Sequence, residues 1–124
     1  MNTPPSIDDI RNARDAALDA LADAVATIGN QIAQTTTTGP FLDQLTKRYQ
    51  DLMNERSMIR AAATETVLSL PAVIAAAAQL TQLSTDMKRT AQELSDATTT
   101  LNKATTILSL GQQFSDVLAS ASNT

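Results

Sequence analysis

The sequence contains no histidine and no cysteine among its 124 residues. These two residue types supply the usual protein ligands of zinc, copper, haem and iron–sulfur centres, and also the usual pairs of nucleophile and general base. We therefore expect no metal site and no cofactor. The lack of cysteine excludes a disulfide, but it fits a secreted protein as well as a cytosolic one, so it leaves the compartment open.

Other residues that carry chemistry are also scarce. The three glycines lie too far apart to form a loop that cradles a phosphate, at Gly29, Gly39 and Gly111. Three glutamates without histidine cannot make the carboxylate metal site of a helical bundle. Ser84 and Lys88 are four residues apart, but an exposed polar helix turn explains them better than a catalytic dyad. The sequence therefore predicts no catalytic residues and a protein that is not an enzyme.

The charge is acidic and unevenly distributed. The formal net charge is −4, and no stripe of lysine and arginine is present, so we expect no nucleic-acid partner. Five aspartates lie between residues 8 and 23, whereas Asp116 is the only charged residue after Lys103. The acidic face of this first segment is best interpreted as a solvated surface, with a basic partner as the alternative.

Membrane and export signals are weak. The start MNTPPSIDD has neither the basic residues nor the apolar core of a signal peptide. The longest uncharged stretch, TVLSLPAVIAAAAQLTQLST at 66–85, mixes Thr, Ser, Gln and a proline among its apolar residues. A permanent membrane helix is thus not expected, although conditional insertion stays open. The compartment stays unassigned between the cytoplasm, export without a cleaved signal, and a virion.

Hydrophobic periodicity predicts that nearly the whole chain is helical. After a flexible segment at 1–5, apolar residues recur every three, four or seven positions over 6–34, as in a half-buried helix. Ser6 and Asp9 have the spacing of a helix-capping box. The sequence TTTTGP at 35–40 predicts a loop, because threonine disfavours helix and Gly-Pro ends it.

A second apolar stripe predicts a helix over 41–69, with charges such as Asp51, Glu55 and Arg60 on a solvated face. Pro71 cannot continue that helix but suits the first turn of the next. We therefore favour a tight reversal at Pro71 over a kink within one long helix.

The clearest pattern is a seven-residue repeat after Pro71. It runs through Val73, Leu80, Met87, Leu94, Leu101 and Leu108. A second series with the same spacing holds mostly small residues and supplies the companion positions, namely Ala76, Leu83, Thr90, Ala97, Ala104 and Gly111. Small side chains at these positions favour close antiparallel packing of helices. We expect Leu80, Met87, Leu94 and Leu101 to be buried, in a third helix over 72–119 that ends in a tail at 120–124.

Together these patterns predict one all-α domain, an antiparallel bundle or coiled coil of three long helices. The third helix would be roughly 70 Å long and the first two roughly 40 Å each, at about 1.5 Å per residue. It would either overhang its neighbours or break near Thr98–Thr100 to give four helices. The unbroken repeat across these threonines favours the overhang.

An overhanging end would expose an apolar surface with a single charge, which soluble monomers rarely leave bare. It would act as a partner-binding surface formed by Ile107, Leu108, Leu110, Phe114, Val117 and Leu118. If this segment instead folds back as a fourth helix, the argument for a projecting surface fails.

Two hypotheses for function follow. The first is a non-enzymatic helical subunit that self-assembles or docks a partner protein, because an alanine-rich composition with abundant Thr, Ser and Gln is typical of subunits of phage particles and bacterial secretion apparatus. The alternative is a membrane-active protein, such as a component of a pore-forming toxin, that exposes 66–85 to lipid. Lipid is the less expected partner, because no lysine or arginine follows Lys103.

Overall fold

The computed structural model describes residues 6–35, 38–94 and 97–122, and within them it contains helices and no strand. The predicted all-α class is therefore confirmed. The helices, in chain order, are α1 (Ile7–Gln34), α2 (Pro40–Ala62), α3 (Glu65–Leu68), α4 (Pro71–Ala75), α5 (Ala77–Gln92) and α6 (Ala97–Ser122).

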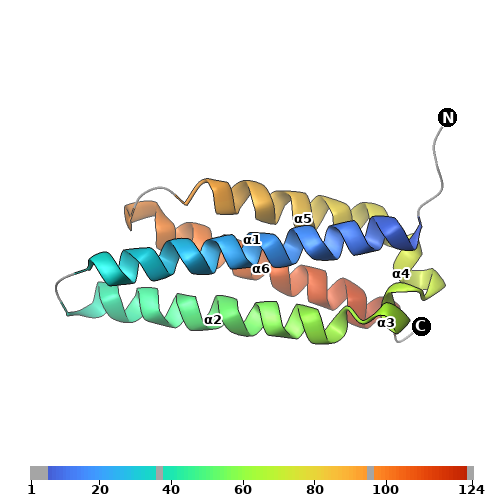
Figure 1. The fold of residues 1–124 in the computed structure, drawn as a ribbon, viewed down its shortest axis with the longest axis horizontal. Coiled ribbons are helices and arrows are strands. Elements are labelled where there is room, and N and C mark those ends of the chain that lie inside the picture. The colour runs from blue at the N-terminus through green and yellow to red at the C-terminus, as the bar shows by residue number, and fades with distance from the viewer. Residues whose placement is uncertain (1–5, 36–37, 95–96, 123–124) are drawn as a thin grey trace.

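The four longest helices run in alternating directions and pack along their lengths (Figure 1). Helix α1 lies beside α2 and α5, and α6 lies beside the same two helices. The short helices α3 and α4 form the corner at which the chain passes from α2 to α5. The fold is thus an antiparallel helical bundle, with its core between α1, α2, α5 and α6.

Helix α1 matches the helix predicted over 6–34. At its start the backbone N–H of Ser6 donates a hydrogen bond to the Asp9 carboxylate at 3.0 Å, as the spacing of these residues predicted. The inward face consists of small and aliphatic side chains, namely Ile10, Ala13, Ala17, Ala20, Leu21, Ala24 and Ile28. The alanines let neighbouring helices approach α1 closely.

The helix predicted over 41–69 is shorter in the structure. Helix α2 ends at Ala62, and the side chain of Thr64 accepts a hydrogen bond from the backbone N–H of Val67 to cap the separate helix α3. The prediction missed this break because the apolar stripe continues through it. Pro71 begins α4 in the first turn, and the chain reverses there as predicted.

The continuous helix predicted over 72–119 is wrong. The structure divides it into α4, α5 and α6, and the chain turns back between Gln92 and Ala97. The break comes just before the expected position at Thr98–Thr100, and residues 95–96 lie outside the described part of the chain. Folding back buries the apolar side of α6 against α2 and α5, which an overhang could not do.

The repeat that predicted the core holds for α5 but changes phase in α6. Leu80, Met87 and Leu94 are buried as predicted, whereas Leu101 is only half-buried. In α6 the buried positions are Thr100, Ala104, Ile107, Gly111, Phe114 and Leu118. Of these, Ala104, Gly111 and Leu118 continue the companion positions of the repeat, whereas the other three belong to neither series. Because the chain reverses before α6, a different side of the helix turns inward.

In the described residues, no helix is long and apolar enough to cross a membrane. The uncharged stretch 66–85 instead supplies side chains to the core. Those that are buried include Leu68, Val73, Ala77, Leu80 and Leu83.

Candidate functional site

The predicted partner-binding residues lie in or against the core, so the expectation of an overhanging apolar edge is wrong. Phe114 and Ile107 are fully buried and Leu118 is 1% exposed. The other three, Leu108, Leu110 and Val117, are half-buried and pack against the same core. The physical reason is the reversal before α6. It packs the segment that holds these residues against the other helices of the bundle.

The acidic face of α1 is mostly neutralised or solvated. Asp8 pairs with Arg11 at 2.9 Å and Asp15 pairs with Arg14 at 3.0 Å. Asp19 and Asp23 are exposed and make no ion pair within the part of the chain that the structure describes. This face therefore gives no positive sign of a binding site.

Helix α2 has the distribution of side chains that the fold explains least. Met53 and Met58 are 46% and 57% exposed, while the carboxylate residue Glu55, between them in sequence, is only 4% exposed. The prediction that Glu55 belongs to a solvated face is thus wrong. Positions where side-chain chemistry opposes burial are the places where function is expected to override packing.

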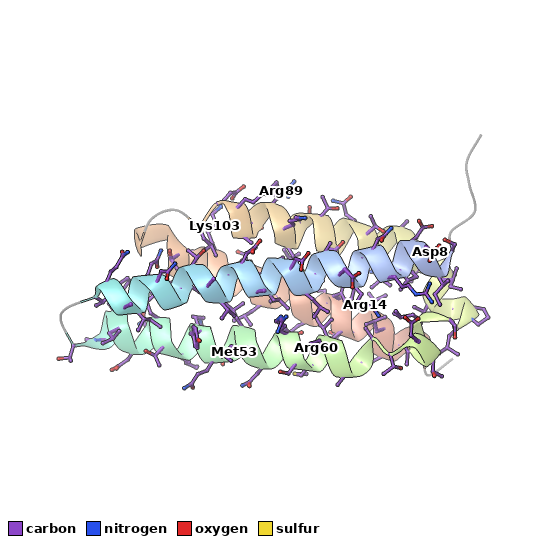
Figure 2. All side chains as sticks on the ribbon, in the orientation of Figure 1. Asp8, Arg14, Met53, Arg60, Arg89 and Lys103 are labelled. Carbon is purple, nitrogen blue, oxygen red and sulfur yellow. The ribbon has the colours of Figure 1, made fainter. Side chains whose placement is uncertain are left out.

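Exposed and uncharged residues form a strip along the middle of α2. We call this the outer strip, and it consists of Gln50, Met53, Asn54, Ser57, Met58 and Ala61. Four of its members are spaced by four, three and four residues, which is the spacing of a seam that packs against another helix. The two methionines flank this seam on its two sides, and Met53 is labelled on α2 in Figure 2.

Glu55 lies on the side of α2 that faces α6, where its side chain fits into a notch at Gly111. A Cβ atom at Gly111 would lie 2.9 Å from Cγ of Glu55, so only glycine leaves room for this side chain. The Ser115 hydroxyl donates a hydrogen bond to Oε1 of Glu55 at 3.0 Å. Burial raises the pKa of Glu55, the Ser115 hydrogen bond opposes this rise, and Asp116 adds to it.

Two adjoining hollows of about 460 Å³ each follow the groove between α2 and α6. Lys47, Arg48 and Thr105 line both of them. Met58, Glu55 and Leu108 reach the first. Of the other predicted partner-binding residues, Val117 lines a different hollow of about 400 Å³, between α4 and α6. The groove between α2 and α6 borders the outer strip, and the two form one continuous side of α2.

The outer strip and the groove carry side chains suited to packing and polar contacts with another molecule. In the described residues no group of acids could hold a metal ion. Ser84 is buried and its hydroxyl donates to the backbone oxygen of Thr81 at 2.9 Å, so the pairing with Lys88 gains no support. The arrangement can pack side chains and form polar contacts at its edges.

The prediction from sequence missed the outer strip, although a signal for it was present. Between Gln50 and Ala61, the charged residues Asp51, Glu55, Arg56 and Arg60 avoid one side of the helical wheel. No protein-family model, no curated protein and no solved structure matches this chain. The function is therefore inferred from the geometry of α2.

Proposed function

We propose that the protein is a helical interaction subunit that docks a helix of another protein, or of a second copy of itself, along the outer strip of α2. The observation that supports this function is the combination of two exposed methionines with a helix-packing seam that carries no charge. On an ordinary solvated helix, this central strip would carry lysine, glutamate or arginine.

The composition of the strip resembles the centre of a protein interface. Such centres are depleted of charged residues and enriched in methionine, whose flexible side chain adapts to a partner. Ser57 and Ala61 are small and allow a partner helix to approach closely. Charged residues flank the strip as a rim would, with Lys47 and Asp51 on the side of α6 and Arg60 on the opposite edge of the helical wheel.

A photo-crosslinking amino acid at Ser57 tests this function. In the cell that produces the protein, we expect it to form one dominant adduct, which mass spectrometry identifies as a partner or a second copy. The same amino acid at Thr85, an exposed position on α5, is the matched control and should form little of that adduct.

The double change Met53→Lys and Met58→Lys should abolish the Ser57 adduct. Because each side chain is about half exposed, the circular dichroism spectrum and the melting temperature should stay nearly unchanged. Adducts of equal yield from Ser57 and Thr85 would contradict the proposal. So would the absence of any adduct together with a solution mass that stays monomeric at all concentrations.

The alternative of a membrane-active protein has weaker support. It would use the uncharged stretch 66–85, whose apolar side chains pack inside the bundle, so the bundle would have to open first. Leakage of a dye from liposomes of anionic and neutral lipid, at concentrations at which the Ser57 adduct is absent, would favour this alternative over docking.

A further inference from the structure

The methionines of the described residues lie in two different environments. Met53 and Met58, on the outer strip, are each about half exposed, whereas Met87 on α5 is fully buried. The chain contains four methionines and no cysteine, tryptophan or histidine, so the thioethers are its most readily oxidised groups. The fourth methionine, Met1, lies outside the described residues. Within the described residues, an oxidant in solution therefore reaches the two methionines of the strip before it reaches the third.

The surface beside both residues has room for a small oxidant. Met53 borders a hollow of about 300 Å³ between α1 and α2. Met58 borders the hollow of about 460 Å³ between α2 and α6. Hydrogen peroxide is only slightly larger than water, which occupies about 30 Å³ in the liquid. Either hollow can therefore admit the peroxide and hold the oxygen atom that it delivers, without any opening of the bundle.

Peroxide converts a thioether into a sulfoxide. The sulfur atom attacks one oxygen of the peroxide, so an S–O bond forms as the O–O bond breaks. The other oxygen leaves as water, which carries away both hydrogen atoms. The sulfur loses two electrons and the peroxide gains them. A flexible apolar side chain thereby becomes a polar one that carries a strong hydrogen-bond acceptor.

A sulfoxide on the outer strip is hydrated in the free protein and loses water when a helix docks. Met53 and Met58 flank the central seam on its two sides, so a helix that packs in the seam covers both. Burying an acceptor that has no donor weakens binding. We propose that Met53 and Met58 form an oxidation site, through which a peroxide switches docking off while the fold stays intact. This inference rests on the docking function that we assign to the outer strip.

Treatment with hydrogen peroxide, followed by peptide mapping, tests the oxidation site itself. Met53 and Met58 should each gain one oxygen atom about tenfold or more faster than Met87, which reacts only when the bundle opens. The circular dichroism spectrum should stay unchanged at the point at which both residues are oxidised. Oxidation of Met87 at the same rate, or loss of the helical signal, would overturn the inference.

The photo-crosslinking amino acid at Ser57 reports the effect on docking. The protein that carries it is oxidised, freed of peroxide with catalase, mixed with an extract of the producing cell and irradiated. Relative to the untreated protein, the dominant adduct should fall about tenfold or more, because docking then buries polar groups without partners. Methionine sulfoxide reductases with a thiol reductant should restore the adduct.

Matched variants assign this loss to the strip. Met87→Leu removes the buried thioether and keeps the strip, so its adduct should fall after peroxide as in the parent protein. The double change Met53→Leu and Met58→Leu keeps apolar side chains that peroxide does not oxidise, and it retains Met1 and Met87. Peroxide should change the adduct yield of this double variant by less than about twofold. A fall as large as that of the parent would place the damage elsewhere and overturn the inference.

The single changes keep the test decisive if the double variant forms too little adduct to measure. Met53→Leu and Met58→Leu each retain one thioether of the strip, so each should lose less adduct after peroxide than the parent does. Losses equal to that of the parent in both single variants would again overturn the inference.

The outcomes also separate the oxidation site from the docking function. An untreated protein that forms no Ser57 adduct contradicts docking, and the inference then fails with it. An adduct that forms equally well before and after complete oxidation of Met53 and Met58 leaves docking in place and overturns only the switch.

Discussion

Helices α1 and α2 are neighbours of similar length, and they differ in how well burial explains their residues. In α1 the inward positions hold alanine, isoleucine and leucine, and exposed positions hold Asp19 and Asp23. In α2 a glutamate faces inward and two methionines face outward. The residues of α1 are therefore accounted for by folding, whereas those of α2 indicate a second requirement, which we assign to binding.

The largest expected effect is in α1, where the aliphatic side chains act only in packing. Leu21 is fully buried, so Leu21→Ala should lower the free energy of unfolding by about 2–5 kcal/mol. Urea denaturation followed by circular dichroism measures this loss. A loss below about 0.5 kcal/mol would mean that the core of α1 is not packed as described.

The next effect concerns the notch that faces α2. Gly111→Ala places a methyl group 2.9 Å from Cγ of Glu55. The overpacking cost, about 1–3 kcal/mol, should exceed the helix propensity gained from alanine, about 1 kcal/mol, and lower the stability.

The control for the clash at position 111 is to remove the side chain of Glu55. In a Glu55→Ala background, Gly111→Ala should become stabilising, because only the gain in helix propensity remains. Gly29→Ala is the comparison in α1, where the nearest atom is Cε2 of Tyr49 at 3.3 Å. It should cost less than Gly111→Ala. The same sign of effect at Gly111 in both backgrounds would disprove the notch.

Glu55 should also make the stability of the protein depend on pH. Because burial raises its pKa, the folded protein holds this proton more tightly than the unfolded chain. The favourable contribution is therefore complete below the unfolded pKa of 4.5 and is lost as pH rises through the higher folded pKa.

Glu55→Gln should accordingly melt at a higher temperature than the wild type at pH 7, and this advantage should vanish near pH 3, below about the usual carboxyl pKa. Thermal unfolding of both proteins across this range measures the difference. Glu93, whose pKa is lowered by its hydrogen bond with Lys103, contributes with the opposite sign but equally in both proteins. A constant difference across the pH range would contradict the burial of a titrating Glu55.

The smallest expected effect is on the outer strip. Met53→Gln should change the free energy of unfolding by less than about 0.5 kcal/mol, because glutamine is similar in length and the side chain at this position is about half exposed. The same change should impair docking. A loss of about 2 kcal/mol in the isolated protein would instead make Met53 a core residue and weaken its role in docking.

Local patterns in the sequence were sufficient for much of the fold. The helix over 6–34, the role of Pro71, and the burial of Leu80, Met87 and Leu94 follow from capping, backbone chemistry and periodicity. The reversal before α6 did not follow, because Leu94 and Leu101 keep their seven-residue spacing across it. Spacing along a chain carries no information about the direction in which the chain runs.

The site was harder to predict, since its key contacts join distant segments. Phe114 was expected to be exposed only because α6 was expected to project, so one missed reversal placed a core residue on the surface. The burial of Glu55 depends on the absence of a side chain at Gly111, on another helix. The sequence of α2 alone does not predict this contact. The uncharged outer strip, in contrast, is visible on a helical wheel.

The notch at Gly111 also fixes how far α6 can slide along α2. The equivalent positions one helical turn away on α6 are Ile107 and Ser115, which carry side chains where Gly111 has none. A displacement of α6 by one turn would press one of these side chains against Glu55. The contact between Glu55 and Gly111 therefore selects one axial alignment of α2 and α6. The apolar stripes of the two helices alone would tolerate several alignments.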